Sequence, residues 1–158
     1  MKKAQVWSLD FIMSVVLFTL VIAMFFFAWT YVNTQSEQQR FFNDIEKAAL
    51  SVSDALVRTK GMPEFWNPDN VKIIGLAADE NVLNSTKVGY FFEMGNADYN
   101  RTKVLLVGTY DFFFEIKDLN GTSYGKIGTK PKERITVPVT RYCVLDNRIV
   151  KVEFALIA

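Results

Sequence analysis

The strongest pattern along the chain is an apolar run near its beginning. From Phe11 to Val32 no residue is charged, and only the hydroxyls of Ser14, Thr19 and Thr30 interrupt the run. These hydroxyls can bond back to the preceding helical turn. At a rise of about 1.5 Å per residue the run covers about 33 Å as a helix, which matches the hydrocarbon thickness of a bilayer. The pattern predicts a membrane-spanning helix over residues 5–32.

After Val32 the pattern becomes amphipathic, with no helix breaker before Gly61. Apolar residues recur at helical spacing, which predicts an apolar stripe on one side of a continuing helix. Gly61 can end this helix in a left-handed conformation, and Pro63 prevents it from resuming. We expect residues 33–60 to continue the spanning helix and to pack their stripe on a head domain, residues 61–158, rather than on a partner. The stripe contains Phe41, Phe42, Ile45, Ala48, Ala49, Val52 and Leu56.

The second half of the head has the two-residue period of β-strands. Apolar and polar residues alternate from Thr109 to Lys117, which predicts a half-buried strand, and Asn120-Gly121 is a hairpin signal. Further strands are expected through Tyr124 and Ile127, through Ile135 to Val139, and after a turn at Asp146-Asn147.

Residues 84–106 are ambiguous, because they fit either two short helices, capped by Ser85 and Asp98, or two strands. The fold class predicted for the whole chain is α+β. A long amino-terminal helix, transmembrane and then amphipathic, packs on a small antiparallel sheet in the head.

The charges that flank the apolar run predict its orientation. Lys2 and Lys3 lie on its amino-terminal side, whereas Glu37 and Arg40 are the first charges beyond its other end. The positive-inside rule therefore puts Met1 in the cytoplasm and the head outside the membrane. A cleaved secretory signal fits less well, since its apolar core runs only about 7–15 residues and ends at a site of small residues. We expect a single-pass membrane protein with an extracytoplasmic head.

Asp10 is the unusual residue of this end, because it lies at the start of the apolar run. A carboxylate inside a membrane costs a few kcal/mol unless it reaches the interface or has a partner. At the interface it would complement the partial positive charge of the helix amino terminus. The residues around Asp10, considered together, indicate what kind of partner its carboxylate would have.

The string Lys2-Lys3-Ala4-Gln5-Val6-Trp7-Ser8-Leu9-Asp10-Phe11 resembles the class III signal peptide of archaeal type IV pilin-like proteins. That signal is a short basic leader ending in a small residue, followed by Gln, a Ser-x-acid-aromatic segment and an apolar helix. Here the leader is very short, and Trp7 places Asp10 one position later than the usual acid. The resemblance implies a pilin-like spine, with the long helix entering a small head.

The resemblance also implies processing and a set of partners. A prepilin peptidase on the cytoplasmic face would read Lys2 and Lys3 and cut between Ala4 and Gln5, so that residues 1–4 form the leader. A cut after Gln5 would restore Asp10 to the usual position, so the peptide bonds before and after Gln5 are both candidate cleavage sites. The Asp10 carboxylate would then pair with the new terminal ammonium of a neighbouring subunit.

Composition removes most other function classes. The sequence contains no His, and Cys143 is its single cysteine, so it offers no Cys/His zinc site, no disulfide within the chain and no His-based catalytic triad. We therefore expect no enzyme, no cofactor and no metal. Beyond residue 32 there are 16 basic and 16 acidic residues. This neutral remainder has no electrostatic footprint for nucleic acid.

Three sequons of the form Asn-x-Ser/Thr lie in the head. Asn84, Asn100 and Asn120 are therefore candidate acceptors of N-linked glycans, provided that the head lies outside the membrane. A basic run, Lys126, Lys130, Lys132 and Arg134, is interpreted as solvated loop charge.

Two functions remain as expectations. The first is a pilin, minor pilin or pseudopilin of an archaeal type IV pilus-like filament or secretion machine. Its partners would be copies of itself or other pilin-like subunits, the prepilin peptidase and membrane lipid. The alternative is an uncleaved single-pass membrane protein whose extracytoplasmic head binds a ligand or senses a signal.

Overall fold

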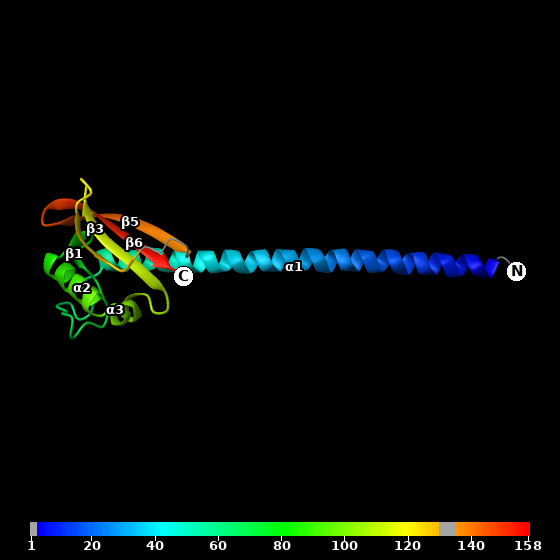
Figure 1. Ribbon diagram of the computed structural model, residues 1–158, viewed down its shortest axis with the longest axis horizontal. Helices are drawn as coiled ribbons and strands as arrows, with labels where there is room; N and C mark the ends of the chain where they lie inside the picture. Colours follow the sequence, from blue (N-terminus) through cyan, green and yellow to red (C-terminus); the bar gives the residue numbers. More distant parts are fainter. Residues whose placement is uncertain (1–2, 130–134) are drawn as a thin grey trace. The chain divides into compact units, whose positions relative to one another are not determined.

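The computed structural model describes residues 3–129 and 135–158, together with the side chains in these ranges except those of residues 3–8 and 35–38. The chain divides into two compact units, Met1–Asn43 and Asp44–Ala158. The first unit contains most of helix α1, which runs from Lys3 to Arg58. The second unit, the head, contains the last turns of α1 and all other elements (Figure 1).

The head combines two short helices with six strands. After α1 come β1 (Ala77–Asp79), β2 (Val82–Leu83), α2 (Ser85–Ala97) and α3 (Tyr99–Leu106). The remaining strands are β3 (Asp111–Asp118), β4 (Ser123–Ile127), β5 (Thr136–Leu145) and β6 (Arg148–Ile157). The α+β class is confirmed, and the ambiguity over residues 84–106 is resolved in favour of two helices.

The six strands form one sheet in the order β1-β2-β5-β6-β3-β4. The four long strands pair antiparallel, as expected, but β2 pairs parallel with β5 through Val82↔Val144 and Leu83↔Leu145. The sheet is therefore mixed, which corrects the all-antiparallel expectation. Parallel neighbours need a long crossover connection, and here α2, α3 and the β3–β4 hairpin supply it.

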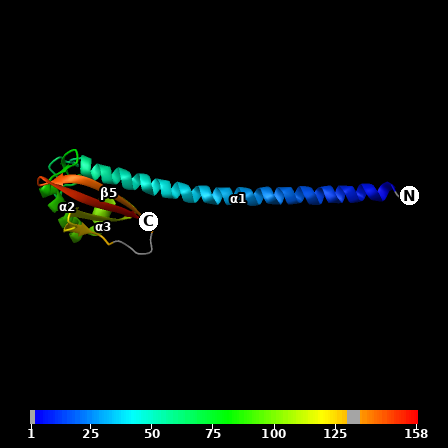
Figure 2. The same ribbon diagram turned by 90° about the horizontal axis from the view of Figure 1, so that it is seen from above.

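The last turns of α1 supply part of the core of the head. Ile45, Ala49, Leu56 and Val57 are fully or almost fully buried in the same cluster as the inner residues of β3, β5 and β6. Figure 2 shows this part of α1 beside the sheet. The predicted stripe was too long at its start, because Phe41 and Phe42 belong to the first unit and are 45% and 48% exposed.

Aromatic rings of α2, α3 and the sheet build the other half of this core. The ring of Phe91 lies 4.9 Å from that of Phe114 in an edge-to-face contact, and Phe112 stacks between Tyr99 and Phe154. Such pairs contribute about 0.5–1.5 kcal/mol beyond the burial of their area. The alternating pattern of β3 therefore predicted its inner face correctly.

The end of α1 is fixed by Gly61 and Trp66. Gly61 has φ +79°, and a Cβ there would lie 2.6 Å from the carbonyl oxygen of Ile73, so only glycine fits. Trp66 is 2% exposed, and its indole N–H donates to the carbonyl oxygen of Gly75 at 2.9 Å. This confirms the predicted stop, and the following loop is anchored to the head.

Candidate functional site

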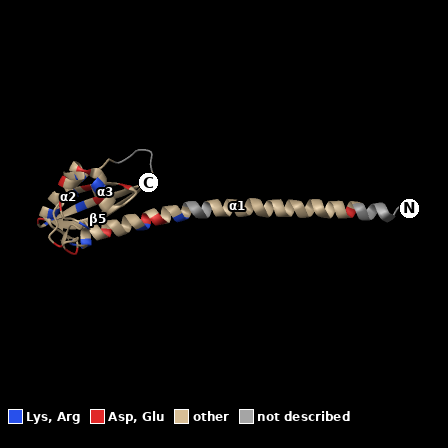
Figure 3. Cartoon of the chain, turned by 90° about the horizontal axis from the view of Figure 1, so that it is seen from below, with Lys and Arg blue, Asp and Glu red and all other residues tan. Residues whose placement is uncertain are grey.

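The apolar segment of α1 is uncovered. Every side chain from Leu9 to Thr34 is exposed, and large apolar residues such as Phe18 and Phe27 are 66% and 82% exposed. Figure 3 shows the same stretch without a charged residue between Asp10 and Thr34. By length and composition, α1 can cross a membrane. The chain itself supplies no apolar surface, among its described residues, that buries this segment.

The hydroxyls of Ser14, Thr19 and Thr30 inside the apolar segment are satisfied within the helix. The Ser14 hydroxyl donates to the carbonyl oxygen of Asp10 at 2.8 Å, and Thr19 donates to that of Val15 at 2.7 Å. Thr30 donates to the carbonyl oxygens of Phe26 and Phe27, both at 3.0 Å. The predicted back-bonding is confirmed. These three hydroxyls therefore bring no unpaired hydrogen-bond donor into hydrocarbon.

Asp10 is exposed at the start of this segment, and the described residues offer its carboxylate no ion pair. Of the expected peptidase recognition residues, Lys2 lies outside the described residues. Lys3, Ala4 and Gln5 belong to α1, but only their backbone is described. The roles expected of Lys2, Lys3, Ala4, Gln5 and Asp10 therefore stay predictions.

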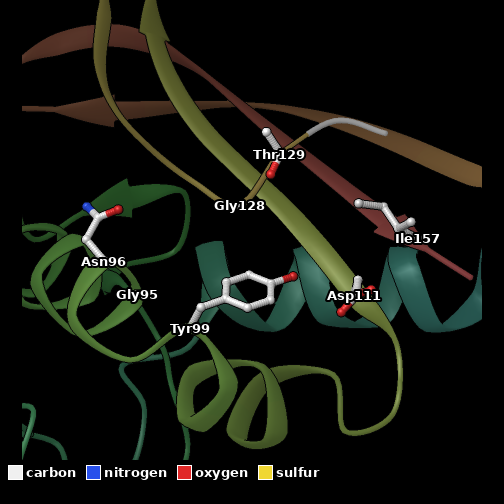
Figure 4. Close-up of a pocket in the computed structure, with 7 residues that line it drawn as sticks. All are labelled: Gly95, Asn96, Tyr99, Asp111, Gly128, Thr129 and Ile157. Atoms are coloured by element: carbon white, nitrogen blue, oxygen red, sulfur yellow. The ribbon is translucent and has the colours of Figure 1, made fainter. Parts of the chain in front are cut away.

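A cleft of the head with a volume of about 690 Å³ lies between α2, α3 and the sheet. Figure 4 shows Asn96 and Tyr99 on one side, Gly128 and Thr129 on the other, and Asp111 near one end. No sequence signal pointed to this cleft, because its residues come from four separate segments. It is the best candidate for a small-molecule site on geometric grounds alone.

Two polar side chains of the cleft, Tyr99 and Asp111, are engaged in structural roles. The Tyr99 hydroxyl donates to the Phe112 carbonyl oxygen at 3.0 Å and accepts from the Phe112 backbone N–H at 2.9 Å. The Asp111 carboxylate pairs with the Lys103 ammonium at 2.7 Å. Neither residue is arranged as a nucleophile beside a base, which nucleophilic catalysis requires.

Other chemically capable side chains of the head are also in structural environments. Burial raises the pKa of Cys143 to about 11, so its thiol is a poor nucleophile near neutral pH. Among the described residues, no three His, Cys, Asp or Glu side chains are grouped to hold a metal ion. Lys126 is exposed, whereas Lys130, Lys132 and Arg134 lie outside the described residues.

The three sequon asparagines lie in different settings. Asn84 is the N-cap of α2, where its side chain accepts from the backbone N–H of Lys87 at 3.1 Å. The predicted cap, Ser85, is instead the first helical residue. Asn100 lies in α3, whose N-cap is Asp98 as predicted. Asn120 is exposed between β3 and β4, at the turn that its sequence predicted.

No family model, curated protein or solved structure matches the chain.

Proposed function

We propose that this chain is a structural subunit of an archaeal type IV pilus-like surface filament or secretion machine. In this proposal α1 holds the subunit in the membrane before assembly, with the amino terminus in the cytoplasm and the head outside. A prepilin peptidase removes residues 1–4, or 1–5 if the cut follows Gln5. The helix then bundles with those of other copies or of related pilin-like subunits.

The observation that carries this proposal is an apolar segment that no described residue covers, with an acid at its start that pairs with no described cation. Lipid alone can cover Leu9 to Val32, whereas the Asp10 carboxylate costs a few kcal/mol unless it reaches the interface or has a partner. Cleavage creates an α-amino group five or four residues before Asp10. In a bundle the ammonium of one subunit can neutralise the carboxylate of the next, within an environment where unpaired charges are costly.

The same assignment fits a head in which the described residues show no nucleophile beside a base. Tyr99 and Asp111 of the cleft are engaged in the fold, and the end of α1 forms part of the core of the head. In this proposal one continuous helix links the assembling segment to the head, and the head faces the medium. We infer a role in assembly and surface contact, without catalysis or a cofactor.

The cleft of about 690 Å³ favours a second candidate. An uncleaved single-pass protein would use such a cleft to bind a ligand outside the membrane. It would keep Lys2 and Lys3 as a cytoplasmic anchor, and its Asp10 would stay at the headgroup level.

Substitution of Asp10 tests the proposed assembly. We expect Asp10→Ala to be processed normally but to be lost from filaments or from the large membrane complex, because the terminal ammonium then has no carboxylate. The measurement combines amino-terminal sequencing with the amount of protein in sheared filaments and in sedimented complexes. Asp10→Glu should restore incorporation, since it keeps the charge.

Ser14→Ala provides the matched control. It lies one turn further along the helix and removes only a hydroxyl that bonds to the Asp10 carbonyl oxygen. We expect this variant to assemble like the wild type. Normal incorporation of Asp10→Ala would refute the pairing role.

A further inference from the structure

The three sequons differ in how far the folded head presents them. N-glycosylation requires the asparagine amide and the hydroxyl two residues later to reach a transferase together, so acceptor sequons lie in surface loops. Only a sequon in which both side chains are exposed and free to move can be modified without unfolding the head.

The sequon at Asn100 fails this requirement. Asn100 itself is exposed, but Thr102 is 0% exposed, and its hydroxyl donates to the carbonyl oxygen of Asp98 at 2.9 Å. Both residues lie in α3, which runs from Tyr99 to Leu106. Presenting Thr102 to an enzyme would require α3 to unwind and a buried side chain to leave the core.

The sequon at Asn84 is held more loosely, but its asparagine is half-buried. The backbone N–H of Asn84 donates to the carbonyl oxygen of Leu76 at 2.8 Å, and its own carbonyl oxygen accepts from Val88 at 3.0 Å. Its side chain also caps α2. Substituting an N-cap typically costs about 0.5–2 kcal/mol, so a transferase that pulls this residue out of place works against the fold.

The sequon Asn120-Gly121-Thr122 is accessible on the surface of the folded head. All three residues are exposed in the connection between β3 and β4. Gly121 has φ +90°, which glycine adopts freely. The turn is held by Asp118, whose carboxylate accepts from the backbone N–H groups of Asn120 at 2.6 Å and Thr122 at 3.2 Å. Within the described residues, neither the Asn120 amide group nor the Thr122 hydroxyl has a hydrogen-bond partner.

The surface beside this turn has room for an attached group. A groove of about 450 Å³ is lined by turn residues and by β3, β5 and β6, among them Leu119, Gly121, Tyr142 and Lys151. The Tyr142 side chain is 62% exposed there. A glycan attached at the neighbouring Asn120 therefore displaces no packed side chain.

We propose that Asn120 is an acceptor of an N-linked glycan, added to the folded head on the outer side of the membrane, while Asn84 and Asn100 stay unmodified. The donor class is a sugar chain carried on a lipid through an anomeric phosphate ester. The Asn120 Nδ2 forms a bond to the anomeric carbon and loses a proton to the transferase. The bond between that carbon and the phosphate oxygen breaks, and the lipid phosphate leaves with the electron pair.

This inference rests on the outward orientation of the head in the proposed function. The test uses the full chain isolated from the membranes and filaments of its native host. Proteolytic peptides that contain each sequon are analysed by mass spectrometry. We expect a glycan mass on the Asn120 peptide and unmodified masses on the Asn84 and Asn100 peptides.

Variants sharpen the assignment. Asn120→Gln and Thr122→Ala should each abolish the glycan, whereas Thr122→Ser, which keeps the hydroxyl, should retain it. Asn100→Gln is the matched control and should leave the glycan unchanged. An unmodified Asn120, a glycan on Asn84 or Asn100, or modification of all three sequons would overturn the inference.

The same digest separates this inference from the proposed function. The amino-terminal peptide reports whether the leader is removed, independently of any sugar. A cleaved amino terminus with an unmodified Asn120 would overturn the glycan assignment alone. A retained Lys2-Lys3 leader with a glycan on Asn120 would overturn the pilin assignment and leave the outward orientation intact.

Discussion

Leu17 and Leu56 are two leucines of helix α1, yet Leu17 is 59% exposed and Leu56 is 1% exposed. Around Leu56 the chain supplies its own apolar partners from α2 and the sheet. Around Leu17 it supplies none among its described residues. Burying a leucine side chain contributes about 1.5–3 kcal/mol, so a segment of this length cannot stay uncovered in water. The head completes its own core, whereas the segment from Leu9 to Val32 needs lipid or other helices.

The two acids Asp10 and Asp54 extend this comparison. Asp54 pairs with the Arg141 guanidinium of β5 at 2.9 Å, while Asp10 has no cation within the described residues. Lipid can replace an apolar partner but not a cation. In the proposed function, the requirement for a second subunit is therefore concentrated at Asp10.

Truncating the two leucines has the largest expected effect. Leu56→Ala should lower the free energy of unfolding of the head by about 2–5 kcal/mol, because it leaves a cavity in a packed core. Leu17→Ala should leave that free energy unchanged. Urea unfolding of the detergent-solubilised full chain measures both. A loss for Leu17→Ala equal to that for Leu56→Ala would show that the apolar segment is covered by the head.

Removing the acids has a smaller expected effect. Asp54→Ala should lower the stability of the head by about 0.2–1 kcal/mol, since the pair with Arg141 is partly exposed. Asp10→Ala should not change the stability of the head, although it should abolish assembly. The same urea titrations, read alongside the amount of protein in filaments, check both. If Asp10→Ala destabilised the head, Asp10 would have a partner within its own chain.

The smallest expected effect is on the pH dependence of stability, and it comes from two lysines of the head whose pKa shifts have opposite signs. Burial lowers the pKa of Lys87 below 10.5, whereas the hydrogen bond to Glu115, with help from Glu153, raises the pKa of Lys117 above 10.5. Keeping the Lys87 ammonium charged lowers the free energy of unfolding of the head. This loss is present in full below the lowered pKa and disappears as the pH rises to 10.5. The stability from Lys117 is present below 10.5 and is lost as the pH rises through its raised pKa.

Thermal unfolding between about pH 9 and 11 tests this pair, since the usual pKa of a lysine, about 10.4, lies in this range. The advantage of the wild type over Lys87→Met should grow with pH, and its advantage over Lys117→Met should shrink. The Lys87 ammonium donates to the Lys60 carbonyl oxygen at 2.6 Å, and a neutral amine can still do so. Parallel trends for the two variants would contradict the assigned environments.

The sequence predicted those elements whose periodicity is long enough to be read. α1 and the strands β3 and β6 follow from sustained patterns, and Gly61 marks the end of the helix through its own backbone conformation. β1 and β2 have only three and two residues, too few for alternation to show, so the parallel pair with β5 was missed.

The candidate sites were predictable to different degrees. Asp10 and the sequons were visible as local motifs, but their surroundings were not. The burial of Thr102 and the choice of Asn84 over Ser85 as N-cap depend on how α2 and α3 pack against distant segments. The cleft at Tyr99 was invisible, because it exists only when four separate segments meet.

Amino-terminal sequencing of the protein isolated from its native membranes and filaments tests the central claim most directly. An assembling pilin-like subunit needs a free α-amino group near Asp10, so we predict a mature chain that starts at Gln5 or Val6. A chain that retains Met1, Lys2 and Lys3 would contradict the proposal and would identify α1 as the anchor of an uncleaved single-pass protein.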